Sequence, residues 1–162
     1  MVEPILAPQY TWFDNTKAKR ANITQIDILD SYTSDGSEIS WDASANKDGS
    51  IMCYVVGTQL IIAGNGSGCI YVNADSSYTF ATPSSVSPRD LFSNVTIING
   101  LNILDVSRAT SFRGFFTNAA KLTKIEGVGN WDTSNNTSLQ AVFYACNALT
   151  LIDGLSNWNT SK

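Results

Sequence analysis

Short runs of apolar residues between positions 23 and 72 have the spacing of β-strands. Ile23–Leu29 alternates apolar and polar side chains, which is typical of a strand with one buried face. Ile51–Val56 and Gln59–Ala63 are β-prone and flank a Gly-Thr pair, so together they predict a hairpin. Cys69–Val72 follows a second glycine-rich turn and is a candidate third strand. The first half of the chain is therefore expected to be rich in β-structure.

From Val95 onward the pattern becomes a repeat of 27 residues without gaps. Its rows are residues 95–121, 122–148 and 149–162, and the third row stops half-finished at Lys162. The columns shared by all rows are Val95, Leu122 and Leu149; Ile98, Ile125 and Ile152; Gly100, Gly127 and Gly154; Leu101, Val128 and Leu155; and Leu104, Trp131 and Trp158. A repeat of this length predicts stacked units of a solenoid.

Each unit predicts one strand, one turn and one short helix. The stretch Leu-x-x-Ile-x-Gly-Leu is extended, and its glycine marks a bulge or a close backbone approach. Asn-Trp-Asp-Thr-Ser has the side chains that start turns. Leu139, Val142, Phe143 and Cys146 then follow the i, i+3, i+4, i+7 spacing of a helix facing a core. The expected fold class is α+β, with a β-rich N-terminal cap and about two and a half strand-turn-helix units.

The repeat motif resembles a known family. Leu-x-x-Ile-Asp-Gly-Leu-Ser-Asn-Trp-Asn-Thr-Ser, with Val-Phe-Tyr-Ala-Cys between copies, is similar to the BspA-like leucine-rich repeats of bacterial surface proteins, over residues 92–162. The preceding stretch from Ser40 to Gly68 also resembles the segment before such arrays. The resemblance implies a leucine-rich-repeat-like solenoid used for adhesion or surface binding, and not for catalysis. The first unit departs from it, with Leu104 in place of tryptophan.

The patterns divide the chain into three parts: an extended N-terminal arm over 1–22, a β-rich cap domain over 23–90 and the repeats over 91–162. In the arm, two prolines and a basic run break any regular period. Its aromatic and basic residues either dock into a partner subunit or form a loose terminus packed by one tryptophan. The residues of this candidate docking segment are Tyr10, Trp12, Phe13, Lys17 and Arg20.

The half-finished third unit predicts an open end. The second half of a 27-residue unit would cover the apolar columns of the first half, and residues 149–162 lack it. A second copy or a partner protein is expected to cover Leu149, Ile152, Leu155 and Trp158, because exposed apolar columns are costly in water. Assembly into a homo-oligomer is therefore expected.

Composition excludes several functions. The formal net charge of −4 leaves no basic stripe for nucleic acid. The chain has no histidine, no Cys-x-x-Cys pair and no phosphate-binding glycine loop, so we expect no cofactor, no metal site and no enzymatic activity. The carboxylates between residues 30 and 48 lie in turn-rich sequence, where neither a glycosidase pair nor a calcium loop is favoured. Cys146 fits a packing site, whereas Cys53 and Cys69 either form a disulfide or stay reduced.

Two settings remain for a binding protein without catalysis. No stretch reaches the roughly 18 apolar residues of a membrane span. The N-terminus carries no secretion signal, which favours a structural or host-attachment protein of a bacteriophage virion. The alternative is a fragment of a secreted or cell-surface adhesin. Expected partners are other virion or surface proteins, or a host receptor or glycan. The candidate surface-binding residues are Lys124, Glu126, Asn130 and Tyr144.

Overall fold

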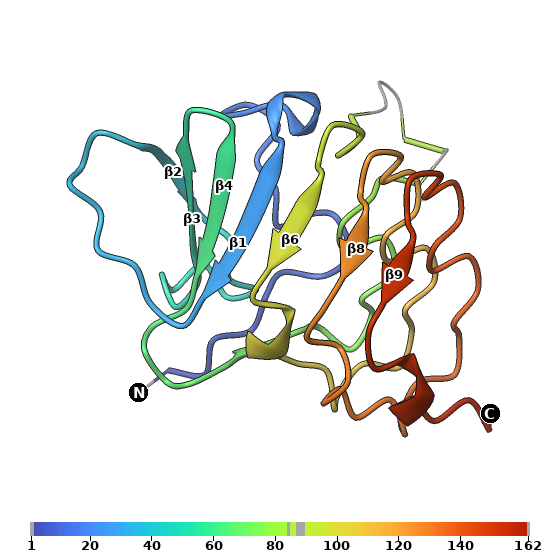
Figure 1. Cartoon of the computed structure of the whole chain (residues 1–162). Helices are drawn as coiled ribbons and strands as arrows, with labels where there is room; N and C mark the ends of the chain where they lie inside the picture. The colour runs from blue at the N-terminus through green and yellow to red at the C-terminus, as the bar shows by residue number, and fades with distance from the viewer. Residues whose placement is uncertain (1, 84, 87–89, 162) are drawn as a thin grey trace.

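The computed structural model describes residues 2–83, 85–86 and 90–161. Its largest element is a mixed five-stranded sheet in the order β2-β3-β4-β1-β6 (Figure 1). The strands are β1 (Gln25–Leu29), β2 (Ile39–Asp42), β3 (Met52–Val56), β4 (Gln59–Ala63) and β6 (Ile97–Asn99). The predicted strand after Asn22 and the predicted hairpin are confirmed, because β3 and β4 pair antiparallel from Met52–Ala63 to Val56–Gln59. Met1, Ser84, residues 87–89 and Lys162 lie outside the described residues.

The four remaining strands have two residues each and pair in parallel across the repeats. They are β5 (Ile70–Tyr71) with β7 (Leu104–Asp105), and β8 (Lys124–Ile125) with β9 (Leu151–Ile152). Three short 3-10 turns complete the elements: η1 (Arg20–Asn22), η2 (Leu101–Ile103) and η3 (Leu155–Asn157). The predicted third strand after Cys69 is present, but it pairs with the first repeat unit and not with the hairpin.

The repeat continues the sheet of the N-terminal half. β1 pairs in parallel with β4 on one side and with β6 on the other, so the first unit adds directly to the cap (Figure 1). Beyond it, the backbone N–H of Thr123 donates to the carbonyl of Thr96, and that of Thr150 donates to the carbonyl of Thr123. These bonds join positions 27 residues apart, so the repeat in the sequence is also the repeat in space.

The repeated glycine allows close approach of adjacent units. Gly100 has a φ of 77°, and a Cβ built there would lie 2.0 Å from the carbonyl oxygen of Ile28. Gly154 has a φ of 87°, and its Cβ would lie 2.3 Å from the Cα of Gly129. Glycine is therefore needed in this column both for its left-handed conformation and for its lack of a side chain.

The expected strand-turn-helix unit is wrong, because the described residues contain no α-helix. The segment that the apolar stripe predicted as helical forms a run of turns, in which Ala141 and Ala145 both have a φ of 58°. Left-handed residues every few positions are incompatible with an α-helix. The N–H groups of Tyr144 and Cys146 donate to the carbonyls of Ala141 and Phe143, three residues earlier, and alternate N–H groups of the preceding unit donate across to this segment. The fold is thus built of strands and turns, and the α+β class is corrected to a β-fold of mixed sheets.

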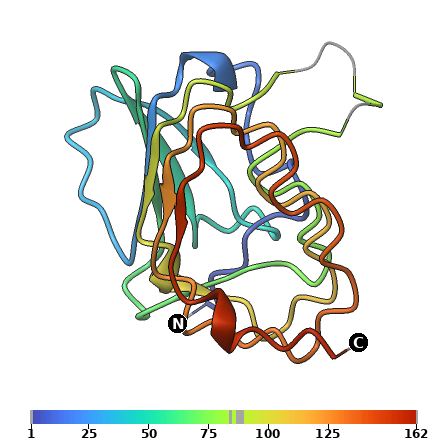
Figure 2. The same ribbon diagram turned by 45° about the vertical axis from the view of Figure 1, so that its right-hand side comes forward.

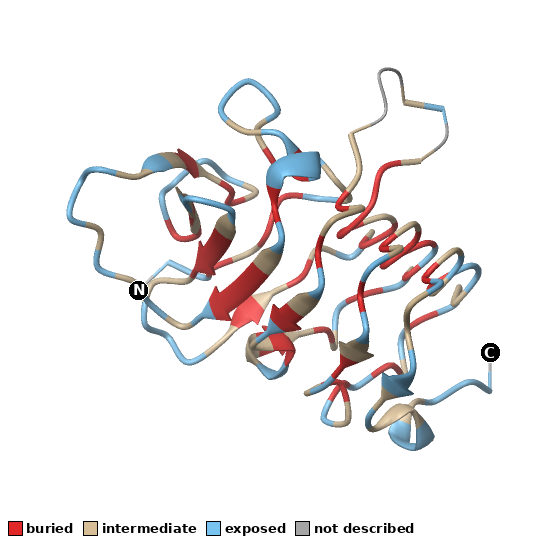
Figure 3. Ribbon diagram, turned by 45° about the horizontal axis from the view of Figure 1, so that its top comes forward, coloured by how far each residue is buried: buried red, intermediate tan, exposed pale blue. Residues whose placement is uncertain are grey.

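Two columns of aromatic rings fill the interior between the strand side and the turn side of the units. Phe80 stacks on Phe116 at 5.7 Å between ring centroids, and Phe116 stacks on Phe143 at 5.9 Å. Trp131 stacks on Trp158 at 5.7 Å. Figure 2 shows the turn segments stacked on one side, opposite the strands. Figure 3 shows that buried residues dominate the middle of the array and become fewer toward the C-terminus.

Candidate functional site: the open end of the repeats

The turn side of the repeats is held by a ladder of backbone hydrogen bonds that point from each unit to the next, whereas the flanking N–H groups of Thr137 and Ala148 donate back to the carbonyls of Thr110 and Ala120. Residues 75–80, 111–118 and 138–145 form its successive rungs. In the first step, Ser76, Tyr78 and Phe80 donate their N–H groups to the carbonyls of residues 111, 113 and 115, at 2.8 to 3.1 Å. In the second step, the N–H groups of residues 112, 114, 116 and 118 donate to the carbonyls of residues 138, 140, 142 and 144, at 2.8 to 2.9 Å. We call this arrangement the turn ladder.

The last rung of the turn ladder presents donors without acceptors. The N–H groups that correspond to residues 112, 114, 116 and 118 in the next unit belong to Leu139, Ala141, Phe143 and Ala145. Within the described part of the chain, these four N–H groups form no hydrogen bond. Gly114 and Ala141 both have positive φ, as do Asn118 and Ala145, so the two rungs have the same backbone conformation. The ladder therefore ends in an edge of N–H donors.

An apolar groove lies beside this edge. Its volume is about 400 Å³, and its lining residues are Leu139, Ala141, Val142, Phe143, Leu155, Trp158 and Thr160. Both aromatic columns end in it, because Phe143 and Trp158 are the last rings and lie 6.3 Å apart. Val142 is buried, whereas the two rings are half-buried. The groove combines apolar surface and backbone donors, which is the chemistry that binds another polypeptide segment.

The structure brings together half of the residues predicted at the open end. Leu155 and Trp158 line the groove. Leu149 and Ile152 instead pack against the core on the strand side and are partly buried. Trp158 donates from its indole Nε1 to the carbonyl of Val128 at 3.0 Å, which fixes the ring in place. Sequence reasoning missed Leu139 and Phe143, because it assigned them to a helix turned toward the core.

The residues predicted as a docking arm pack on their own chain. Trp12 is 1% exposed, and its indole Nε1 donates to the carbonyl of Thr79 at 2.8 Å. Phe13 and Arg20 are also buried, and the Arg20 guanidinium lies 4.4 Å from the centre of the Phe13 ring. Burial lowers the pKa of Arg20 to about 10. These side chains are not available to a partner in this conformation.

The same arm closes the other end of the turn ladder. The first rung has carbonyls at Asp75 and Thr79 on its outer side. The backbone N–H of Gln9 donates to the carbonyl of Asp75 at 3.2 Å, and the indole Nε1 of Trp12 donates to the carbonyl of Thr79. Of the remaining predicted arm residues, Tyr10 is half-buried and Lys17 is exposed. The arm therefore acts as a lid over the acceptor end of the array.

The predicted surface residues do not form one site. Lys124 and Glu126 lie at β8 and form an ion pair at 2.9 Å. Asn130 lies at the turn that follows this strand and lines a separate polar cavity. Tyr144 is 67% exposed and belongs to the last rung of the turn ladder. Only Tyr144 is close in sequence to the groove residues.

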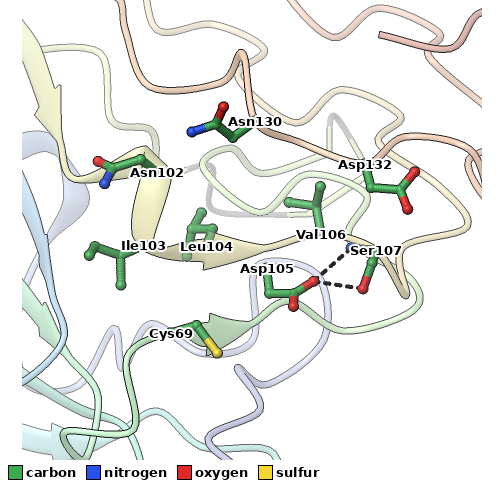
Figure 4. Close-up of a pocket in the computed structure, with 9 residues that line it drawn as sticks. All are labelled: Cys69, Asn102, Ile103, Leu104, Asp105, Val106, Ser107, Asn130 and Asp132. Atoms are coloured by element: carbon green, nitrogen blue, oxygen red, sulfur yellow. Dashed lines mark hydrogen bonds between the residues drawn. The ribbon is translucent and has the colours of Figure 1, made fainter. Parts of the chain in front are cut away.

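The polar cavity has a volume of about 310 Å³ and lies near β7. Figure 4 shows the residues around it, which are Cys69, Asn102, Ile103, Leu104, Asp105, Val106, Ser107, Asn130 and Asp132. The Asp105 carboxylate accepts from the N–H and hydroxyl of Ser107 at 3.0 and 2.7 Å, which is a local turn bond. These polar groups mainly bond within their own turns, so this cavity is a weaker candidate than the groove.

The other chemically reactive groups are dispersed. The described residues contain no cluster of three or more metal-ligating side chains. Glu38 has its pKa lowered to about 2, because the hydroxyls of Ser34 and Tyr32 donate to its carboxylate. All three thiols are free, so Cys53 and Cys69 do not form the disulfide that the sequence left open. Burial raises the pKa of the Cys53 thiol well above its ordinary value.

The chain is thus a short stack of 27-residue units, each made of a strand and turns, and the stack is joined to a β-rich cap. Residues 86–162 match the family described as "Mycoplasma protein of unknown function, DUF285". No curated protein and no solved structure matches the chain. The matched residues begin just before the first unit, so the family resemblance covers the repeats and the groove but not the cap.

None of the helical segments in the described residues is long and apolar enough to cross a membrane.

Proposed function

We propose that this chain is a non-enzymatic attachment protein that binds another protein through the open end of its repeats. One observation carries the proposal: the half-buried rings of Phe143 and Trp158 line a groove of about 400 Å³, beside four N–H groups that have no acceptor among the described residues. Aromatic anchors in a partly formed pocket are typical of protein-binding surfaces. Tyr144, on the outer face of the same turn, supplies a further contact at the rim.

The setting proposed first is the bacteriophage virion, in which the chain serves as a structural or host-attachment part. The resemblance to BspA-like surface repeats supports attachment in either setting. The alternative is a bacterial cell-surface or secreted adhesin, and one observation favours it: the matching family is described from Mycoplasma, which are bacteria. Immunogold labelling of phage particles and of intact cells of the source organism distinguishes the two. Label on cells alone overturns the virion setting.

The binding role is tested with a matched pair of leucine substitutions in the third unit. Leu155 lines the groove, whereas Leu151 is 51% exposed on the strand side and outside the groove. We expect labelled chain to bind to its particles or cells, Leu155→Asp to abolish this binding and Leu151→Asp to retain it. Binding that survives Leu155→Asp, with both variants folded, would refute the groove as the attachment site.

A further inference from the structure

We propose that the groove is filled by a polypeptide segment with the chemistry of the repeat's own turn rung, and not by a second copy of this chain. This inference rests on the proposed function, because it names what the groove binds. Each rung of the turn ladder meets the next through N–H groups on one side and carbonyls on the other. Between Leu139 and Ala145 the open edge presents N–H donors, so its occupant must present carbonyls at alternate residues along this stretch.

The apolar side of the groove specifies the occupant further. The rings of Phe80, Phe116 and Phe143 stack in register, with centroid spacings of 5.7 and 5.9 Å. The outer face of Phe143 is the place for a fourth ring. An occupant that continues the ladder would place an aromatic or large apolar side chain there, four residues after another apolar residue, as in Leu139 and Phe143.

A second copy of the chain cannot supply this segment without unfolding part of itself. Head-to-tail stacking would require the free carbonyls of the first rung, but Gln9 and Trp12 already occupy those of Asp75 and Thr79. Displacing them would pull a tryptophan that is 1% exposed out of the core. A symmetric dimer through the groove would set one edge of N–H donors against another. The symmetric arrangement leaves the donors unsatisfied, which is unfavourable when they are buried.

The direct test completes the third unit within the chain. Residues 136–148 are the second half of unit two, and a copy of them placed after Lys162 brings unit three to 27 residues. In a control chain, the appended copy has serine at the two positions that correspond to Leu139 and Phe143, and the original Leu139 and Phe143 are unchanged. The readout is amide hydrogen exchange, followed by NMR, at the original Leu139, Ala141, Phe143 and Ala145.

We expect the appended copy to slow exchange at these four amides by roughly ten-fold or more, as a formed hydrogen bond does. The control copy should leave them fast. Equal exchange in the extended and original chains would overturn the proposal. It would also be overturned if the original chain dimerises at high concentration and protects the same four amides. These outcomes are independent of the attachment test. In that test, binding that survives Leu155→Asp refutes the proposed function, whatever the amide exchange shows.

Discussion

Gly100 illustrates how one residue fixes the contact between the cap and the first repeat. Its left-handed backbone and its 2.0 Å approach to the Ile28 carbonyl make any side chain costly. Gly57, at the tip of the β3–β4 hairpin, has a φ of 61° but open space around it. The two glycines therefore separate the cost of backbone conformation from the cost of steric overlap.

We expect Gly57→Ala to destabilise the protein by about 1 kcal/mol, from the left-handed conformation alone. Gly100→Ala should cost more, by roughly a further 2 kcal/mol or greater, because the β1 backbone must also move. Urea unfolding of both variants measures the difference. Equal destabilisation would show that the close approach of Gly100 to Ile28 is not formed.

The Glu38 carboxylate makes the stability of the fold depend on pH. Its pKa of about 2 lies below the ordinary 4.5, so its contribution to stability is present above about pH 4.5 and is lost as the pH falls toward 2. We expect NMR titration to give the low value, and Ser34→Ala to raise it, because the largest contribution comes from the Ser34 hydroxyl. A normal pKa in the unmodified protein would contradict the hydrogen bonds to Glu38.

At the scale of the element, the sequence predicted the strands of each unit better than the segment between them. The strands could be predicted because their apolar columns and the glycine after them recur in every unit. At Gly100, the left-handed backbone and the close approach to Ile28 explain why the column holds glycine. The apolar stripe through Leu139 and Phe143 does not distinguish a helix from a turn rung, because in this rung the buried and half-buried apolar residues have the same spacing as one face of a helix. Gly114 and Asn118, which are poor helix formers, were the signal against a helix in the first unit.

The aromatic column makes a prediction about this element. Phe116 is fully buried between two rings, whereas Phe143 is half-buried at the open end. We expect Phe116→Ala to lower the free energy of unfolding by about 3–5 kcal/mol, and Phe143→Ala to lower it clearly less. Chemical denaturation of the two variants tests this order. The reverse order would mean that Phe143 is covered in solution.

At the scale of the whole molecule, the two ends of the array differ. The N-terminal arm covers the acceptor end with Gln9 and Trp12, and the donor end is open beside the groove. Sequence analysis predicted an open end from the repeat count and placed Leu155 and Trp158 there. It did not predict the arm's fold, because the contact between Trp12 and Thr79 joins residues 67 positions apart. Only tertiary structure brings such residues together.

Removal of residues 2–20 tests the role of the arm. We expect the shortened chain to lose cooperative unfolding, because Phe80 and Phe92 lose their contacts with Trp12 and become exposed. Near-ultraviolet circular dichroism during thermal unfolding is the measurement. A shortened chain that retains a sharp transition would show that the arm is dispensable for folding and free to serve another purpose.

Amide exchange in the unmodified chain tests the turn ladder and its polarity most directly. The N–H groups of residues 112, 114, 116 and 118 donate to the next rung, and those of residues 139, 141, 143 and 145 have no acceptor within the described residues. We expect the first set to exchange slowly and the second set to exchange at rates near those of an exposed backbone. Slow exchange at both sets in the monomer, or fast exchange at both, would contradict a ladder that ends in an open edge of donors.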